Sequence, residues 1–153
     1  MQDVDNVYKP SHTGLCVTDL ERSLRFYCDG LGFKRASTYH LTRQIAEVDP
    51  PVDVTAQFIE LGALEIELLH YASPGVIGEP SRRRNQLGLT HLSFVVDDVE
   101  ARALELEAAG GTILPETRND TTDPDTERIL FVADPDGTRI ELMSIPPNHP
   151  YWA

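Results

Sequence analysis

Cysteine is scarce in this chain, with two residues, Cys16 and Cys28, among 153. They fall on a predicted strand and a predicted helix, so we expect reduced thiols in a reducing compartment rather than a disulfide. No apolar run approaches the length of a membrane span, and the first ten residues contain no apolar signal core. The sequence therefore predicts a cytoplasmic protein with no membrane partner.

Basic residues are also few, with 13 Lys and Arg against 25 Asp and Glu and a net charge of −12. Nucleic-acid phosphates are bound by clustered Lys and Arg, so this balance argues against a nucleic-acid partner. One basic run, Arg82-Arg83-Arg84, lies in a stretch rich in Pro and Gly. We interpret it as a solvated loop. The alternative is a site for a phosphate or carboxylate at the tail of a substrate.

Hydrophobic residues make up 41% of the chain, which is enough to bury a core, and we expect a single domain over residues 1–153. A weak internal repeat runs through it. His12 opens one copy and His91 opens the other, an offset of 79 (91 − 12). The same offset relates three further pairs, which are Asp19 and Asp98, Glu21 and Glu100, and Gly32 and Gly111.

Each copy has the hydrophobic pattern of a strand, a helix and three more strands. We predict a module at 10–72, a linker at 73–88, a second module at 89–146 and a C-terminal tail at 147–153. The helices are expected to begin at Thr18 and Asp97, each followed three residues later by a capping-box Glu. The predicted strands are 12–18, 33–41, 54–61 and 64–71 in the first module, and 90–96, 111–114, 128–133 and 138–144 in the second.

Acidic side chains alternate with apolar ones on the last strand of each module. Glu65 and Glu67 share one face of the first such strand, and Glu141 lies opposite the apolar face of the second. His12 and His91 also lie opposite the cleaner apolar faces of their strands. If the strands curl into an open cup, these side chains line its inside, where a carboxylate must be paired or bind a metal. Two imidazoles and two carboxylates suit a divalent ion such as Zn, Ni, Co, Mn or Fe.

Four segments together resemble the vicinal oxygen chelate superfamily, which includes glyoxalase I, methylmalonyl-CoA epimerase, extradiol dioxygenases and bleomycin-type antibiotic-binding proteins. The segments are HTGLCVTDLERSLRFYCDGLGF, LGALEIELLHY, GLTHLSFVVDD and FVADPDGTRIELM, and the resemblance covers about residues 10–146. It implies an α+β fold of two βαβββ modules that form an open, barrel-like cup of eight strands around a metal site. It also implies metal ligands at His12, Glu67, His91 and Glu141. Glu67 is preferred to Glu65 because the family's ligand at this place directly precedes a short apolar stretch.

Departures from the family patterns help to sort its subfamilies. Extradiol dioxygenases carry a Tyr where this chain has Phe131 and a further His nearby, and residues 121–127 contain no His. Glyoxalase I usually has a glutathione-binding Arg four residues beyond its first ligand, where this chain has Cys16. The epimerases usually show paired His at the third ligand, where this chain has Thr90-His91. Antibiotic-binding members generally lack the ligand set that this chain keeps.

The resemblance thus implies a metal-dependent lyase, isomerase or epimerase that acts on a small carbonyl substrate through a metal-stabilised enediolate. Glu141 or Glu67 would be the catalytic base, with Glu141 preferred because it follows the most family-like turn. We also expect a homodimer. An extradiol-type dioxygenase and a non-catalytic small-molecule binding protein remain the alternatives, and the substrate, the metal and the number of chains that supply each ligand set stay open.

Overall fold

The computed structural model describes residues 8–152, which form two compact units. One unit comprises the chain up to Thr18 together with Phe33–Val76. The other comprises Asp19–Gly32 together with the chain from Ile77 onward. The first seven residues, interpreted above as free of a signal core, and the last residue of the predicted tail lie outside the described part.

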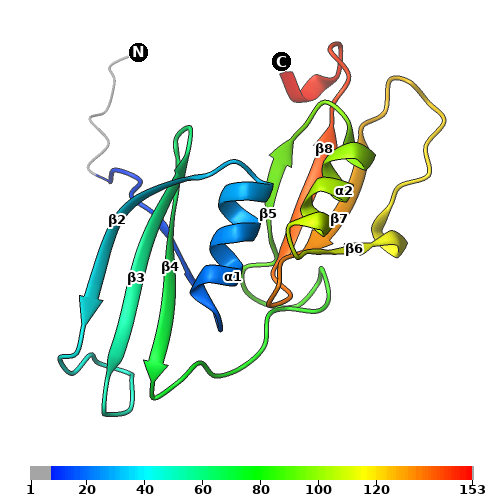
Figure 1. The fold of residues 1–153 in the computed structure, drawn as a ribbon. Helices are drawn as coiled ribbons and strands as arrows, with labels where there is room; N and C mark the ends of the chain where they lie inside the picture. Colours follow the sequence, from blue (N-terminus) through cyan, green and yellow to red (C-terminus); the bar gives the residue numbers. More distant parts are fainter. Residues whose placement is uncertain (1–7, 153) are drawn as a thin grey trace. The chain divides into compact units, whose positions relative to one another are not determined.

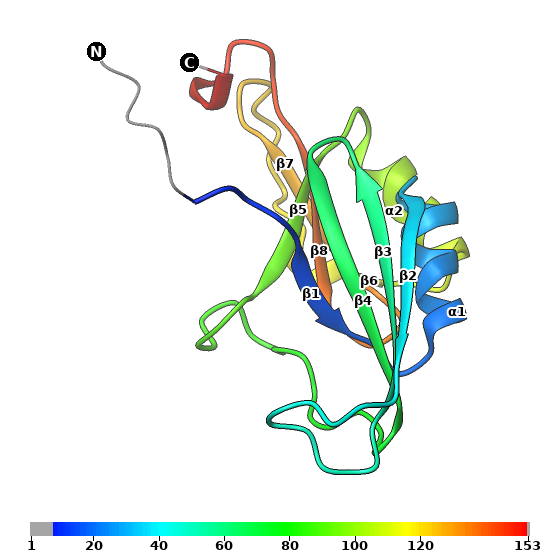
Figure 2. The ribbon, with the colours of Figure 1, turned by 90° about the vertical axis from the view of Figure 1, so that its left-hand side faces the viewer.

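The first unit contains a four-stranded mixed sheet in the order β1-β4-β3-β2 (Figures 1 and 2). Its outer strand β1 (Thr13–Cys16) runs parallel to β4 (Leu64–Ser73), while β3 (Asp53–Leu61) and β2 (Lys34–Leu41) continue the sheet in antiparallel fashion. Alternation along the strands buries one face of the sheet. The fully buried side chains on β3 and β4 include Ile59, Ile66 and Leu68.

The second unit repeats this sheet in the order β5-β8-β7-β6. Here β5 (His91–Val95) runs parallel to β8 (Arg139–Ser144), and β7 (Arg128–Ala133) and β6 (Thr112–Leu114) follow in antiparallel fashion. Two open, four-stranded mixed sheets with few helices confirm the predicted α+β class.

Residues 8–152 contain two α-helices, and the N-cap of each lies one residue later than the capping pattern predicted. Helix α1 (Leu20–Leu24) continues as a π-helical segment, η1 (Arg25–Gly30), and α2 spans Val99–Ala108. Their N-caps are Asp19 and Asp98, whose side chains accept hydrogen bonds from the backbone N–H three residues on. The prediction of Thr18 and Asp97 as caps is therefore wrong. The actual caps are the repeat-related aspartates.

Helix α2 packs on β6, β7 and β8 and contacts η1 within the second unit. Gly111, which follows α2, permits this close packing. A Cβ at Gly111 would lie 2.6 Å from the Phe26 ring and 2.9 Å from both the Leu106 carbonyl oxygen and Val132. Only a glycine fits such a close approach of backbone and ring.

The remaining elements are short 3-10 turns at η2 (Pro115–Thr117) and at η3 (Pro150–Trp152) in the C-terminal tail. Among the helices of residues 8–152, none combines the length and the apolar character that crossing a membrane requires.

Candidate metal-binding pairs

The first pair of predicted ligands meets between two parallel strands. His12 lies immediately before β1, and Glu67 lies on β4 in register with Gly14. His12 Nε2 and Glu67 Oε2 are 3.3 Å apart, and the two side chains are 34% and 22% exposed. The parallel pairing of the first and last strands of the module thus joins residues that are far apart in sequence.

The second pair is built in the same way. His91 opens β5, and Glu141 lies on β8 in register with Ser93, as Glu67 does with Gly14. The distance from His91 Nε2 to Glu141 Oε2 is again 3.3 Å, with 31% and 14% of the side chains exposed. The structure therefore brings the predicted residues together two by two, one pair in each unit.

The surroundings of the two histidines match as well. The Nδ1 atom of His12 is hydrogen-bonded to the Ser11 hydroxyl at 2.8 Å, and that of His91 to the Thr90 hydroxyl at 2.7 Å. Because a hydroxyl engages Nδ1, each ring is oriented with its Nε2 toward the carboxylate, as a hydrogen bond to the other ring nitrogen orients a metal-binding imidazole.

An aromatic ring also contacts each histidine. Phe58 meets the His12 ring edge to face at 5.1 Å and 81°, and Phe131 meets His91 at 5.2 Å and 78°. Each Phe lies opposite the glutamate of its pair in the antiparallel ladder. Strand register therefore fixes the His, Glu and Phe of each module as a unit.

The donor set and its spacing fit a divalent metal. Two ligands at about 2.1 Å from one ion lie about 3.0 Å apart at a right angle and about 3.4 Å apart at a tetrahedral angle. The 3.3 Å between Nε2 and Oε2 in each pair falls within that range. Within residues 8–152, no three or more His, Cys, Asp or Glu side chains form one group that could hold a metal. The joining of both pairs around one ion stays a prediction.

The model of the Glyoxalase/Bleomycin resistance protein/Dioxygenase superfamily matches residues 9–142, a range that contains both pairs. The chain belongs to this superfamily. The predicted family is thereby confirmed, and the open, two-module fold is the one expected for a glyoxalase-superfamily protein.

Known proteins resemble this glyoxalase-superfamily chain over most of its length. The uncharacterized protein YaeR of Escherichia coli is 34% identical over 133 residues, which cover 86% of this chain and 92% of YaeR. A lactoylglutathione lyase of Haemophilus influenzae is 31% identical over 136 residues, covering 86% and 89% of the two chains. The crystal structure of a glyoxalase family protein from Bacillus cereus shares the fold, with a TM-score of 0.76 at 16% identity over 95% of this chain and 99% of its own.

Proximity of a histidine to a carboxylate does not by itself mark a metal site in this superfamily member. His40 Nε2 lies 2.8 Å from Asp53, and His149 Nε2 lies 3.2 Å from Glu127. Neither His40 nor His149 has an edge-on phenylalanine among the described residues, in contrast to His12 and His91. The repeated environment, rather than the pairing alone, distinguishes the two candidate pairs.

A buried carboxylate fixes the turn that leads into Glu141. Asp134 is 3% exposed and accepts hydrogen bonds from the Tyr27 hydroxyl at 2.8 Å and from the backbone N–H groups of Asp136 and Thr138. Burial raises the pKa of Asp134, and burial with the nearby Asp134 charge raises the pKa of Tyr27 well above its ordinary value. This turn, Asp134-Pro135-Asp136-Gly137, lies within one of the family-like segments. Its contact with Tyr27 was not predicted from the sequence.

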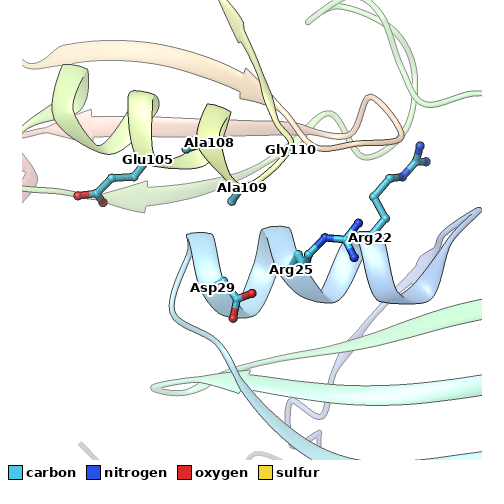
Figure 3. A pocket seen from close by; sticks show the side chains of 7 residues that line it. All are labelled: Arg22, Arg25, Asp29, Glu105, Ala108, Ala109 and Gly110. Atoms are coloured by element: carbon cyan, nitrogen blue, oxygen red, sulfur yellow. The ribbon is translucent and has the colours of Figure 1, made fainter.

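A separate pocket lies between the helices of the second unit (Figure 3). One wall is formed by Arg22, Arg25 and Asp29, and the Arg22 guanidinium also donates to Asp136 at 2.7 Å. None of the predicted metal ligands lines this pocket. The opposite wall is formed by α2 and the residues that follow it, namely Glu105, Ala108, Ala109 and Gly110.

Proposed function

We propose that the protein is a metal-dependent lyase, isomerase or epimerase that acts on a small carbonyl compound. The observation that carries this proposal is the repetition of one His–Glu geometry, with an Nε2–Oε2 distance of 3.3 Å in both modules. Identity of about a third to proteins that include a lactoylglutathione lyase supports an enzymatic role.

In this proposal His12, Glu67, His91 and Glu141 hold the ion. A bound divalent metal would supply Lewis-acid polarisation of a carbonyl oxygen. The histidines bind through Nε2 because Ser11 and Thr90 engage their Nδ1 atoms. Each carboxylate contributes Oε2, the atom that already faces the imidazole.

Glu141 is the proposed base, which removes a proton from the carbon beside the substrate carbonyl. It is the less exposed of the two glutamates, at 14% against 22% for Glu67, so its carboxylate meets less competing water. The turn before β8 is also held by the buried Asp134, which restrains the strand that carries Glu141. A fixed base close to its proton is what general-base catalysis requires.

The substrate contacts differ from those of glutathione-dependent relatives. Cys16, exposed on β1, stands where the resemblance leads us to expect the glutathione-binding Arg of glyoxalase I. A thiol supplies neither the charge nor the fork of donors of a guanidinium. We therefore propose a carbonyl substrate that is bound by different protein groups from those that would bind a glutathione adduct.

We further propose a homodimer. The edge strand β2 is exposed along Lys34–His40, and an unpaired edge of this kind is usually covered or paired in a native protein. Light scattering at micromolar concentration should report twice the 17.1 kDa mass of the chain. A monomer at that concentration would refute the dimer.

Metal content tests the ligand assignment. Purified wild-type protein, desalted stringently, should retain a divalent ion, and alanine at His12, His91, Glu67 or Glu141 should release most of it, since the remaining ligands compensate poorly. His40→Ala is the matched control, because it removes a histidine that also faces a carboxylate. Equal metal content in the wild type and all five variants contradicts the proposed site.

Solvent exchange tests the reaction class. We expect metal-dependent exchange of a C–H proton for deuterium in at least one compound from a panel of thiohemiacetals, acyl-CoA esters and α-hydroxy ketones. Oxygen consumption with a catechol would instead identify dioxygenase chemistry. Tight binding of a compound without any exchange would identify a binding protein.

A further inference from the structure

The two matched pairs differ in what covers their aromatic ring. In the first module Phe58 is met by Tyr39, edge to face at 5.8 Å. In the second module the guanidinium carbon of Arg84 lies 4.4 Å from the centre of the Phe131 ring. A neutral side chain therefore stands at one pair and a cation at the other.

Several contacts hold Arg84 at this place. Its Nη2 donates to the Thr117 carbonyl oxygen at 3.2 Å, and the Thr117 hydroxyl accepts from the Phe131 N–H at 2.9 Å. The Arg139 guanidinium donates to the carbonyl oxygen of Arg82, which precedes Arg84 by two residues in the linker. The segment interpreted as a solvated loop is thus attached to the second module by the side chain of Arg84 and by the contact of Arg139 with the Arg82 backbone.

The charge of Arg84 lies near the second pair. Since Arg84 and His91 contact the same ring, the two centre distances place the guanidinium carbon within about 10 Å of the His91 ring, about the Debye length at 0.1 M salt. Arg139 adds a second positive charge, because it lies two residues before Glu141 and directly opposite His91 in the ladder. The corresponding residue of the first module is the acidic Glu65.

Arg84 also keeps donors for a ligand. Its side chain is exposed, and among residues 8–152 it makes no ion pair, although acids outnumber bases in the chain by 25 to 13. Of the five N–H donors of a guanidinium, the contact with Thr117 uses one. The stack on Phe131 orients the planar group, which lowers the entropy that a bound oxyanion would have to remove.

We propose that Arg84 binds an oxyanion, a carboxylate or a phosphoryl group, that the substrate carries a few bonds away from its reacting carbonyl. This inference rests on the proposed function, because that function identifies the reacting carbonyl. The anion site itself does not depend on it. In a chain with a net charge of −12, a local cation beside the second pair is what attracts an anionic substrate. The same charge discriminates against neutral carbonyl compounds of equal size.

Binding of matched probes tests the inference without any turnover. The probes are 2-oxoglutarate, its 5-methyl ester and the analogue with a phosphonate in place of the remote carboxylate, titrated by calorimetry into full-length protein with and without divalent metal. Wild type should bind the diacid or the phosphonate about tenfold to a hundredfold more tightly than the ester, the range expected for a hydrogen bond to a charged group. The tighter of the two identifies the natural oxyanion.

Three variants separate charge from structure. Arg84→Met keeps the apolar stem and should abolish the preference over the ester while leaving ester binding unchanged. Arg84→Lys should keep part of the preference, because charge remains but the fork is lost. Arg83→Met, the matched control, removes the same formal charge from the neighbouring residue and should keep the full preference.

Each outcome separates this inference from the proposed function. A preference for a probe with the remote charge over the ester that survives in Arg84→Met, or one that falls equally in Arg83→Met, overturns the inference even if metal is retained. Equal loss of ester and diacid binding in Arg84→Met shows a purely structural role and also overturns it. An Arg84-dependent preference in protein that retains no metal supports the anion site and counts against the proposed function alone.

Discussion

The two modules share one His–Glu geometry and differ in the hairpin before the glutamate and in the side chain that covers the phenylalanine. Each joins a His before or at its first strand to a Glu on its last strand, with a hydroxyl on Nδ1 and an edge-on Phe. The hairpin before the ligand strand, however, has two connecting residues in the first module and five in the second. The strand ladder therefore keeps the His–Glu geometry the same in both modules, while the hairpin turn differs between them.

The largest expected effect distinguishes the two glutamates as bases. Glu141→Gln should slow substrate C–H exchange by about 10²–10⁴-fold, because removal of a general base typically costs that much. Glu67→Gln should weaken metal retention. With metal in excess, however, it should keep a greater fraction of the wild-type exchange rate than Glu141→Gln does. Exchange rates measured by NMR at saturating metal check this. Equal losses in both variants would show that the modules are equivalent in chemistry as well as geometry.

The next effect concerns the turn that only the second module has. Tyr27→Phe should lower the free energy of unfolding by about 1.5–3 kcal/mol at neutral pH, since the buried Asp134 carboxyl loses a donor. Urea unfolding measures the loss. Tyr39→Phe, an exposed tyrosine of the first module, is the control and should change stability little.

The same variant should reveal a dependence on alkaline pH. Because burial raises the pKa of Tyr27 in the folded protein above its ordinary value of 10.0, its stabilising contribution is present below that pH and is lost as the pH rises further. The stability difference between wild type and Tyr27→Phe should therefore shrink above about pH 10. A constant difference up to pH 11 would contradict the assignment.

A comparison of the repeat-related glycines should give an effect of similar size. Gly111→Ala should destabilise the fold by about 2–3 kcal/mol, because its Cβ would overlap the Phe26 ring and the Leu106 carbonyl. Gly32→Ala meets open space but must adopt a φ of +84°, and a loss of about 1 kcal/mol is expected. Urea midpoints of the two variants check the order. A greater loss at Gly32 would show that backbone strain outweighs packing here.

The smallest effect tests whether the hydroxyl contacts are equivalent. Ser11→Ala and Thr90→Val should each weaken metal binding about tenfold, the low end for a group that orients a ligand, because both hydroxyls are partly solvated. Competition with a chelator measures the affinities. Thr126→Val removes a hydroxyl bonded to Asp123, away from both pairs, and should leave the affinity unchanged.

Local patterns in the sequence predicted most of the fold. The strand predicted at 128–133 matches β7 residue for residue, since a continuous apolar run at 129–133 is bounded by turn-forming residues on both sides. The caps were misplaced by one residue because Thr18-Asp19 and Asp97-Asp98 each offer two capping residues in succession. The second residue of each pair is the cap, because its side chain accepts a hydrogen bond from the backbone N–H three residues on.

Contacts between distant residues were beyond the reach of such patterns. The resemblance implied His12 with Glu67 and His91 with Glu141 as ligands, because its motifs include the segments that carry all four residues. The hydrogen bond of Tyr27 to Asp134 spans 107 positions and occurs once, so no recurrence marked it. The stack of Arg84 on Phe131 was hidden in the same way, since a basic run among Pro and Gly gives no sign of its partner.

The parallel pairing of first and last strands has a consequence for the ancestry of this architecture. Because each His–Glu pair forms across one strand pairing, β1-β4 or β5-β8, a single module carries everything that one pair needs. Duplication of one such module would have copied a complete His–Glu pair. The two copies could then diverge in the residues that cover the phenylalanine, to Tyr39 in one and Arg84 in the other, without disturbing the His–Glu pairs.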